Sequence, residues 1–201
     1  MNKNLKLRAI VWEIIVPIVL YYIVFLSTMY FIFAFIGHTA SKYMIAQIIS
    51  AAITIPFMYF ASYKPTQQMF VEKPKIDRGL FINVLRVIVI TLFISFALNN
   101  IITMSPLIGL SEGYAKANES FYASTLALEL IGSAILSPIM EELVFRGIVF
   151  GNMRKIMNVP QAVFLSALLF GLIHFNVVQF VYAFLLGLVL AAFMYKSGHV
   201  Y

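Results

Sequence analysis

The 201-residue sequence contains no cysteine, which excludes disulfide bonds and thiolate metal sites. Charge is also scarce: aspartate, glutamate, lysine and arginine make up 11% of the chain, whereas about a quarter is usual in a soluble domain. Hydrophobic residues reach 62%, and we find no soluble domain, low-complexity tract or internal repeat. This composition excludes an ordinary soluble domain and indicates an integral membrane protein.

The apolar residues form six segments long enough to cross a bilayer. They are approximately residues 10–36, 43–62, 80–104, 121–150, 160–176 and 177–195. Each must be helical in lipid, because no water is present there to satisfy unpaired backbone groups. The first segment is too long for the core of a signal peptide, so we interpret it as a retained span. The fold class we expect is an all-α polytopic membrane helix bundle.

Positive charges are distributed unevenly among the predicted loops, and this distribution predicts the orientation. Two residues, Lys42 and Lys116, lie on one side, and ten lie on the other. These ten are Lys3, Lys6, Arg8, Lys64, Lys73, Lys75, Arg78, Arg154, Lys155 and Lys196. Because cytoplasmic loops carry the excess of lysine and arginine, both termini are predicted to be cytoplasmic. The net charge of +6 is therefore a topology signal, and we expect a lipid bilayer and no nucleic acid as partner. The low tryptophan content and the abundance of Ile, Lys and Asn are typical of a low-GC bacterium, which predicts a bacterial plasma membrane.

Three charged residues interrupt the fourth apolar segment, in the stretch SPIMEELVFRG. A charge at the bilayer centre costs roughly 2.5–3.5 kcal/mol on insertion scales, so these residues need a reason to be there. Arg146 follows Glu142 by four positions, so the two side chains are expected to pair on one helix face. Glu141 points about 100° away and has no local partner in this pattern. It is therefore either neutralised by protonation or functional.

His174 lies in the next apolar segment at a matching depth. Glu141 precedes Arg154 by 13 residues and His174 follows Pro160 by 14, so each lies about 20 Å from the turn between the two segments. An acid and an imidazole at equal depth on adjacent helices could deprotonate a water molecule or bind a metal. Phe170, one turn before His174, could form a wall of this site. A histidine that only packs and forms hydrogen bonds remains the alternative.

Other polar residues in the apolar segments are interpreted as structural. Arg86 is a candidate partner of Glu13 or Glu142, and Glu129 lies near the outer end of its span. His38 is expected in a loop and His199 in the C-terminal tail.

Proline and glycine near the acidic pair predict two local features. Pro138 removes a backbone hydrogen bond, so we expect a kink that opens space beside Glu141. Gly147 and Gly151 form a small-xxx-small pattern that allows another helix to approach closely, most simply for packing.

Two motifs carry a resemblance to a known family. Glu141, Glu142 and Arg146 form EExxxR, and Phe170 and His174 form FxxxH on the following segment. In this order the motifs resemble the first two signatures of the CPBP intramembrane proteases, the type II CAAX prenyl proteases and their bacterial relatives, also called the Abi family. The resemblance covers residues 121–201, which we separate as a protease core from N-terminal transmembrane helices in residues 1–120.

The resemblance implies an all-α membrane protein that hydrolyses a peptide bond in a membrane-associated protein or peptide substrate. It implies that Glu141 activates the attacking water, that His174 helps to hold it, and that Glu142 and Arg146 shape the site. The family leaves two mechanisms open. Either a divalent metal such as Zn²⁺ takes part, bound by Glu141 and His174, or none is needed. Two protein ligands would leave a zinc site incomplete, since a catalytic zinc usually has three.

The third family signature, a histidine followed four residues later by asparagine, has no counterpart in the sequence. His199 cannot begin it, because only Val200 and Tyr201 follow. We therefore expect a chain that stops before the family's last helix. A non-catalytic membrane protein that binds peptides or confers bacteriocin self-immunity is the alternative function. A small transporter with Glu129, Glu141 and His174 as a proton relay is less well supported, because no inverted repeat is found.

Overall fold

The computed structural model describes residues 8, 10–37, 39–67, 78–110 and 124–197. Every regular element among them is helical, which confirms the predicted all-α class. The chain divides into two compact units, and each is described by itself. The first unit comprises Met1–Gln68 with Ala117–Ile156, and the second comprises Met69–Lys116 with Met157–Tyr201. The predicted boundary between residues 120 and 121 concerns the family resemblance and stays a prediction.

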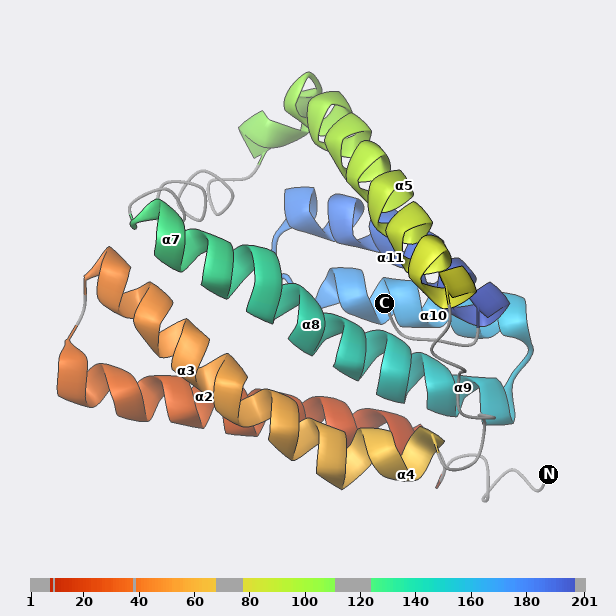
Figure 1. Ribbon diagram of the computed structural model, residues 1–201, viewed down its shortest axis with the longest axis horizontal. Helices are drawn as coiled ribbons and strands as arrows, with labels where there is room; N and C mark the ends of the chain where they lie inside the picture. The colour runs from red at the N-terminus through yellow and green to blue at the C-terminus, as the bar shows by residue number, and fades with distance from the viewer. Residues whose placement is uncertain (1–7, 9, 38, 68–77, 111–123, 198–201) are drawn as a thin grey trace. The chain divides into compact units, whose positions relative to one another are not determined.

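The first unit begins with two antiparallel helices that lie side by side (Figure 1). They consist of the elements η1 (Val11–Ile15), α2 (Val16–Ile36), α3 (Ala40–Met58), η2 (Tyr59–Tyr63) and α4 (Lys64–Gln67). Gly37 ends α2 with a φ of 83°, a left-handed conformation that glycine adopts without steric cost. Its N–H donates to the carbonyl of Phe33 at 2.9 Å, which satisfies one of the free carbonyls at the helix end.

The third helix of this unit contains the acidic pair and runs without a break from Leu126 to Ile156. It alternates between α- and π-helical hydrogen bonding. Its elements are α7 (Leu126–Glu129), η4 (Leu130–Leu136), α8 (Ser137–Glu141), η5 (Glu142–Phe150) and α9 (Gly151–Ile156). Pro138 lies in the first turn of α8, directly after a π-helical segment. The kink predicted at Pro138 stays a prediction, but the hydrogen-bonding pattern does change beside it.

Close contacts fix this helix against α3 and its extension (Figure 1). A Cβ built on Gly132 would lie 3.2 Å from Cγ1 of Ile48, and one built on Gly151 would lie 3.2 Å from Cγ2 of Thr66. Both glycines therefore allow close helix approach, as predicted for Gly151. Between them, Nε2 of Gln47 donates to Oγ of Ser137 at 2.8 Å, so α3 is held one turn before Glu141.

The second unit contains a long helix and a helical hairpin. Its elements are α5 (Arg78–Thr103), η3 (Pro106–Leu110), α10 (Val159–Leu172) and α11 (Val177–Ser197). A Cβ on Gly171 would lie 2.9 Å from Cδ2 of Phe180, and one on Gly187 would lie 3.2 Å from Cα of Ala167. These glycines let α10 and α11 pack backbone to backbone, while α5 packs on α11 (Figure 1).

Four helices in the described ranges are long and apolar enough to cross a membrane. They are Val11–Ile36, Ser41–Thr66, Phe81–Thr103 and Val177–Lys196. They correspond to four of the six predicted spans, so the chain is an integral membrane protein. The charged helix from Leu126 to Ile156 is not among them. The predicted span 160–176 is too long, because α10 has 14 residues and ends at Leu172.

Candidate active site

Glu142 and Arg146 form the ion pair that the sequence predicts. Nε of Arg146 lies 3.2 Å from Oε1 of Glu142, and both residues belong to η5. The side chain of Arg146 is 1% exposed and that of Glu142 is 12% exposed. A charge this deeply buried depends on its partner, because the loss of either one leaves the other uncompensated. The pair therefore stabilises the folded position of this helix next to Glu141.

Glu141 ends α8 and is partly buried. The charge of Arg146 acts on Glu141 as well as on Glu142, while its ion pair is with Glu142. The expectation that Glu141 has no partner of its own on this helix stays a prediction.

Two tyrosines of α2 lie within electrostatic reach of Glu141. Glu141 interacts electrostatically with both Tyr21 and Tyr22, and Tyr21 is 6% exposed. The two rings contact each other edge to face, with centroids 4.8 Å apart. Sequence reasoning missed these residues, although two adjacent tyrosines in the middle of an apolar span were a visible signal.

Polar side chains on one face of α3 continue toward Glu141. Gln47, Ser50 and Thr54 are three and four residues apart, so they share a face. Gln47 is bonded to Ser137, which places this face against the helix of Glu141. Ser50 and Thr54 are fully buried, and neither hydroxyl has a hydrogen-bond partner within the described residues. The interface of α3 with the helix of Glu141 therefore contains a hydrogen bond between two side chains and is not purely apolar.

Glu13 forms contacts within the first unit that the sequence did not predict. Oε2 of Glu13 lies 3.2 Å from Nζ of Lys155, and its carbonyl oxygen accepts a bond of 2.6 Å from Nδ2 of Asn152. Arg86 belongs to the second unit, so its pairing with Glu13 or Glu142 stays a prediction. Packing of η1 against α9 brings Glu13 to Lys155, and a residue pattern within one helix cannot reveal this contact.

His174 lies two residues beyond the end of α10, in the turn that leads to α11, and not inside a helix as predicted. Its Nδ1 is 2.9 Å from the carbonyl oxygen of Phe170, and the two rings meet edge to face with centroids 5.3 Å apart. A carbonyl can only accept, so Nδ1 carries the proton and Nε2 of the neutral ring carries the lone pair. This tautomer suits a base or a ligand that acts through Nε2.

Asn176 holds the turn from its other side. Its Oδ1 accepts hydrogen bonds from the backbone N–H groups of Val178 at 2.9 Å and Gln179 at 3.2 Å, so it caps α11. Between His174 and Asn176, Phe175 has a φ of 50° and is 90% exposed. A bulky residue at positive φ is a strained conformation, which the bonds on both sides hold in place. An asparagine directly before an apolar run was the signal for this cap.

The predicted site residues fall into two groups. The structure brings Glu141, Glu142 and Arg146 together in the first unit and places His174 in the second. Their meeting at equal depth stays a prediction. In the described part of the chain, no group of three His, Cys, Asp or Glu side chains could hold a metal ion. His38 and His199 lie outside the described residues.

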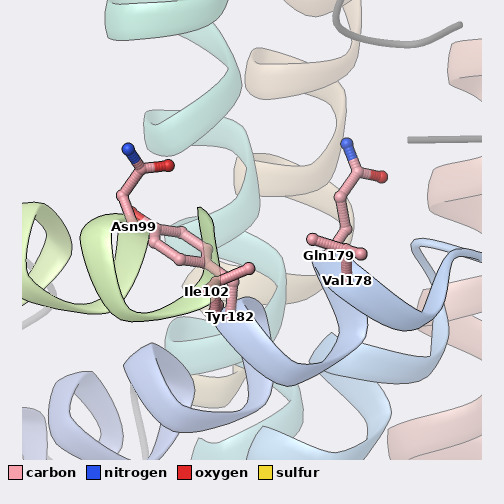
Figure 2. Close-up of a pocket in the computed structure, with 5 residues that line it drawn as sticks. All are labelled: Asn99, Ile102, Val178, Gln179 and Tyr182. Carbon is pink, nitrogen blue, oxygen red and sulfur yellow. The ribbon is translucent and has the colours of Figure 1, made fainter. Parts of the chain in front are cut away.

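A small pocket lies in the second unit near the turn that contains His174 (Figure 2). It has a volume of about 120 Å³ and is lined by Asn99, Ile102, Val178, Gln179 and Tyr182. Sequence reasoning missed it, because contact between α5 and α11 creates it.

These features define a polytopic membrane helix bundle with a carboxylate pair and a histidine of defined tautomer. Residues 123–201 match the family described as Type II CAAX prenyl endopeptidase Rce1-like, which confirms the family resemblance seen in the motifs. The matched segment contains both EExxxR and FxxxH, and the family supports a CAAX-type intramembrane protease role. No curated protein and no solved structure matches the chain.

Proposed function

We propose that this protein is an intramembrane endopeptidase that hydrolyses a peptide bond in a membrane-associated protein or peptide. The match over residues 123–201 carries the proposal, and the matched range contains Glu141 and His174. The position of Glu141 directly before the ion pair of Glu142 with Arg146 and the lone pair on Nε2 of His174 support the same chemistry. The bacterial plasma membrane remains the proposed location.

In the proposed reaction Glu141 accepts a proton from a water molecule, and the resulting hydroxide attacks the carbonyl carbon of the substrate. Nε2 of His174 accepts a hydrogen bond from the same water and orients it. When the carbon–nitrogen bond breaks, Glu141 returns the proton to the leaving amine. Arg146 stays paired with Glu142 throughout, and this pair holds the part of the helix next to Glu141. Glu142 therefore acts as a positioning residue for Glu141.

Metal participation is not required by these steps. A catalytic zinc usually has three protein ligands, and the described side chains do not supply such a set. Glu141 and His174 would be the two candidate ligands of a divalent ion. The proposal therefore uses only the proton transfers that these two side chains can perform.

Cleavage by the full chain, purified and reconstituted in lipid nanodiscs, tests the proposal. Mass spectrometry of a mixed peptide library should detect products with the native protein. Glu141→Gln should lower the rate by at least about 100-fold, because general acid–base catalysis contributes roughly that much or more. Glu129→Gln is the matched control, since Glu129 is a buried acid of the same helix.

Unchanged cleavage by a well-folded Glu141→Gln protein contradicts the assigned role. Binding of peptides by the native protein without any cleavage would instead support the alternative, a non-catalytic peptide-binding or bacteriocin self-immunity protein.

A further inference from the structure

The pocket between α5 and α11 combines an apolar floor with three polar groups. Ile102 and Val178 are 5% and 2% exposed and form the floor. Asn99, Gln179 and Tyr182 complete the lining, and their side chains have no hydrogen-bond partner in the ranges that the structure describes. The amides of Asn99 and Gln179 extend from different helices in the same direction (Figure 2). Two carboxamides and a phenol are thus available to a ligand.

The chemistry of the lining selects the kind of ligand. Each carboxamide offers both donors and an acceptor, and the phenol offers one of each. None of the described residues that line the pocket is charged, so they offer no counter-charge to an ionised group, whose desolvation is costly. The volume of about 120 Å³ corresponds to about four water molecules at roughly 30 Å³ each. The pocket therefore fits one small, uncharged group that both donates and accepts hydrogen bonds.

The position of the pocket relates it to His174. Val178 and Gln179 lie in the first turn of α11, and their backbone N–H groups are bonded to Asn176. Asn176 follows His174 by two residues in the same turn. A ligand in the pocket would thus contact the helix that begins directly after the turn of His174.

We propose that this pocket is a specificity subsite that binds one uncharged polar side chain of the peptide substrate, a carboxamide or a hydroxyl. The subsite rests on the proposed peptide substrate, but its test does not require cleavage. A polar side chain that forms hydrogen bonds with Asn99, Gln179 or Tyr182 binds better than an apolar side chain of the same size. The pocket thus chooses which residue of a substrate lies next to the turn of His174.

Peptide binding to full-length Glu141→Gln protein in nanodiscs tests the subsite. The probes are fluorescent, C-terminally amidated alanine hexapeptides with Gln, Ser or Leu at each position in turn, and fluorescence anisotropy gives the Kd. We expect one position at which Gln or Ser binds about threefold to tenfold more tightly than Leu, as one or two hydrogen bonds would allow. Gln179→Leu and Asn99→Leu should each abolish that preference and leave binding of the Leu peptide unchanged.

Two matched controls lie outside the pocket. Asn100 is adjacent to Asn99, but its amide already donates to the carbonyl of Phe96 at 2.7 Å. Gln161 is an exposed glutamine in the first turn of α10. Asn100→Leu and Gln161→Leu should keep the preference. Because Asn99 is exposed, Asn99→Leu gives a folded test protein even where Gln179→Leu does not.

The outcomes separate the subsite from the proposed reaction. A preference that survives both Asn99→Leu and Gln179→Leu overturns the subsite, and so does the absence of any preference or of binding. A preference that depends on these residues, in a native protein that cleaves no peptide, upholds the subsite and refutes the hydrolase.

Discussion

Nδ1 of His174 lies 2.9 Å from the carbonyl oxygen of Phe170, and this bond leaves the lone pair of the imidazole on Nε2. His174→Asn tests which nitrogen matters, because the asparagine amide can replace the Nδ1 donor but not Nε2. We expect the variant to fold normally and to cleave peptides at least about 100-fold more slowly. Thermal melting and product formation measure the two effects. Cleavage within about threefold of the native rate would show that Nε2 takes no part.

The meeting of Glu141 with His174 can be tested directly because the native chain contains no cysteine. We expect a short bifunctional maleimide to crosslink the double variant Glu141→Cys with His174→Cys. Ile131→Cys with His174→Cys is the control, since Ile131 lies about 15 Å from Glu141 along the helix. Intramolecular crosslinks can be counted by mass spectrometry after proteolysis. Equal yields from the two pairs, or a yield only from the control, would contradict the proposed site.

Arg146→Ala is expected to destabilise the first unit severely. The change leaves the carboxylate of Glu142 without its cation, and breaking a buried pair costs about 3–5 kcal/mol. The yield of monodisperse protein after gel filtration should fall sharply. Arg146→Met combined with Glu142→Gln should recover part of it, because the double variant removes the buried charge pair. A normal yield from Arg146→Ala alone would refute the structural role of the pair.

Gly171→Ala is expected to destabilise the hairpin of α10 and α11. The added Cβ would lie 3.0 Å from the carbonyl oxygen of Phe180, a backbone atom that cannot rotate away. Overpacking costs about 1–3 kcal/mol, which exceeds the gain of up to about 1 kcal/mol from replacing a helical glycine by alanine. The melting temperature should therefore fall. Gly109→Ala is the control, because no heavy atom of the described residues lies within 4 Å of the position that its added Cβ would take. A rise in melting temperature for Gly171→Ala would show that the hairpin can relax around the methyl group.

Contacts within one helix could be predicted from the sequence. The pairing of Glu142 with Arg146 needs only helical spacing and a reason to avoid a lone buried charge. The positions of the four long helices could be predicted as well, because each is a long and mainly apolar run in the sequence. The π-helical segments beside Glu141 were not predicted, because apolar periodicity does not distinguish them from α-helical turns.

Contacts between helices could not be predicted from the sequence. The bond from Gln47 to Ser137 joins positions 90 residues apart, and the ion pair of Glu13 with Lys155 depends on the same kind of long-range packing. The end of α10 was also placed four residues too late. Ile173 and Phe175 are apolar and continue the hydropathy of the helix, although the backbone has already turned.

The length of α10 has a consequence for the surrounding lipid. Its 14 residues extend about 21 Å, whereas the hydrocarbon core of a typical bilayer is about 30 Å thick. Local thinning of the membrane is one way to accommodate a helix this short, beside snorkelling of flanking residues and oligomerisation, and it has a modest cost for each ångström of mismatch. Such thinning would draw the polar headgroup region toward the turn of His174. The proposed hydrolysis consumes one water molecule for each bond cleaved, and a thinned bilayer at this point would bring bulk water closer to the turn of His174.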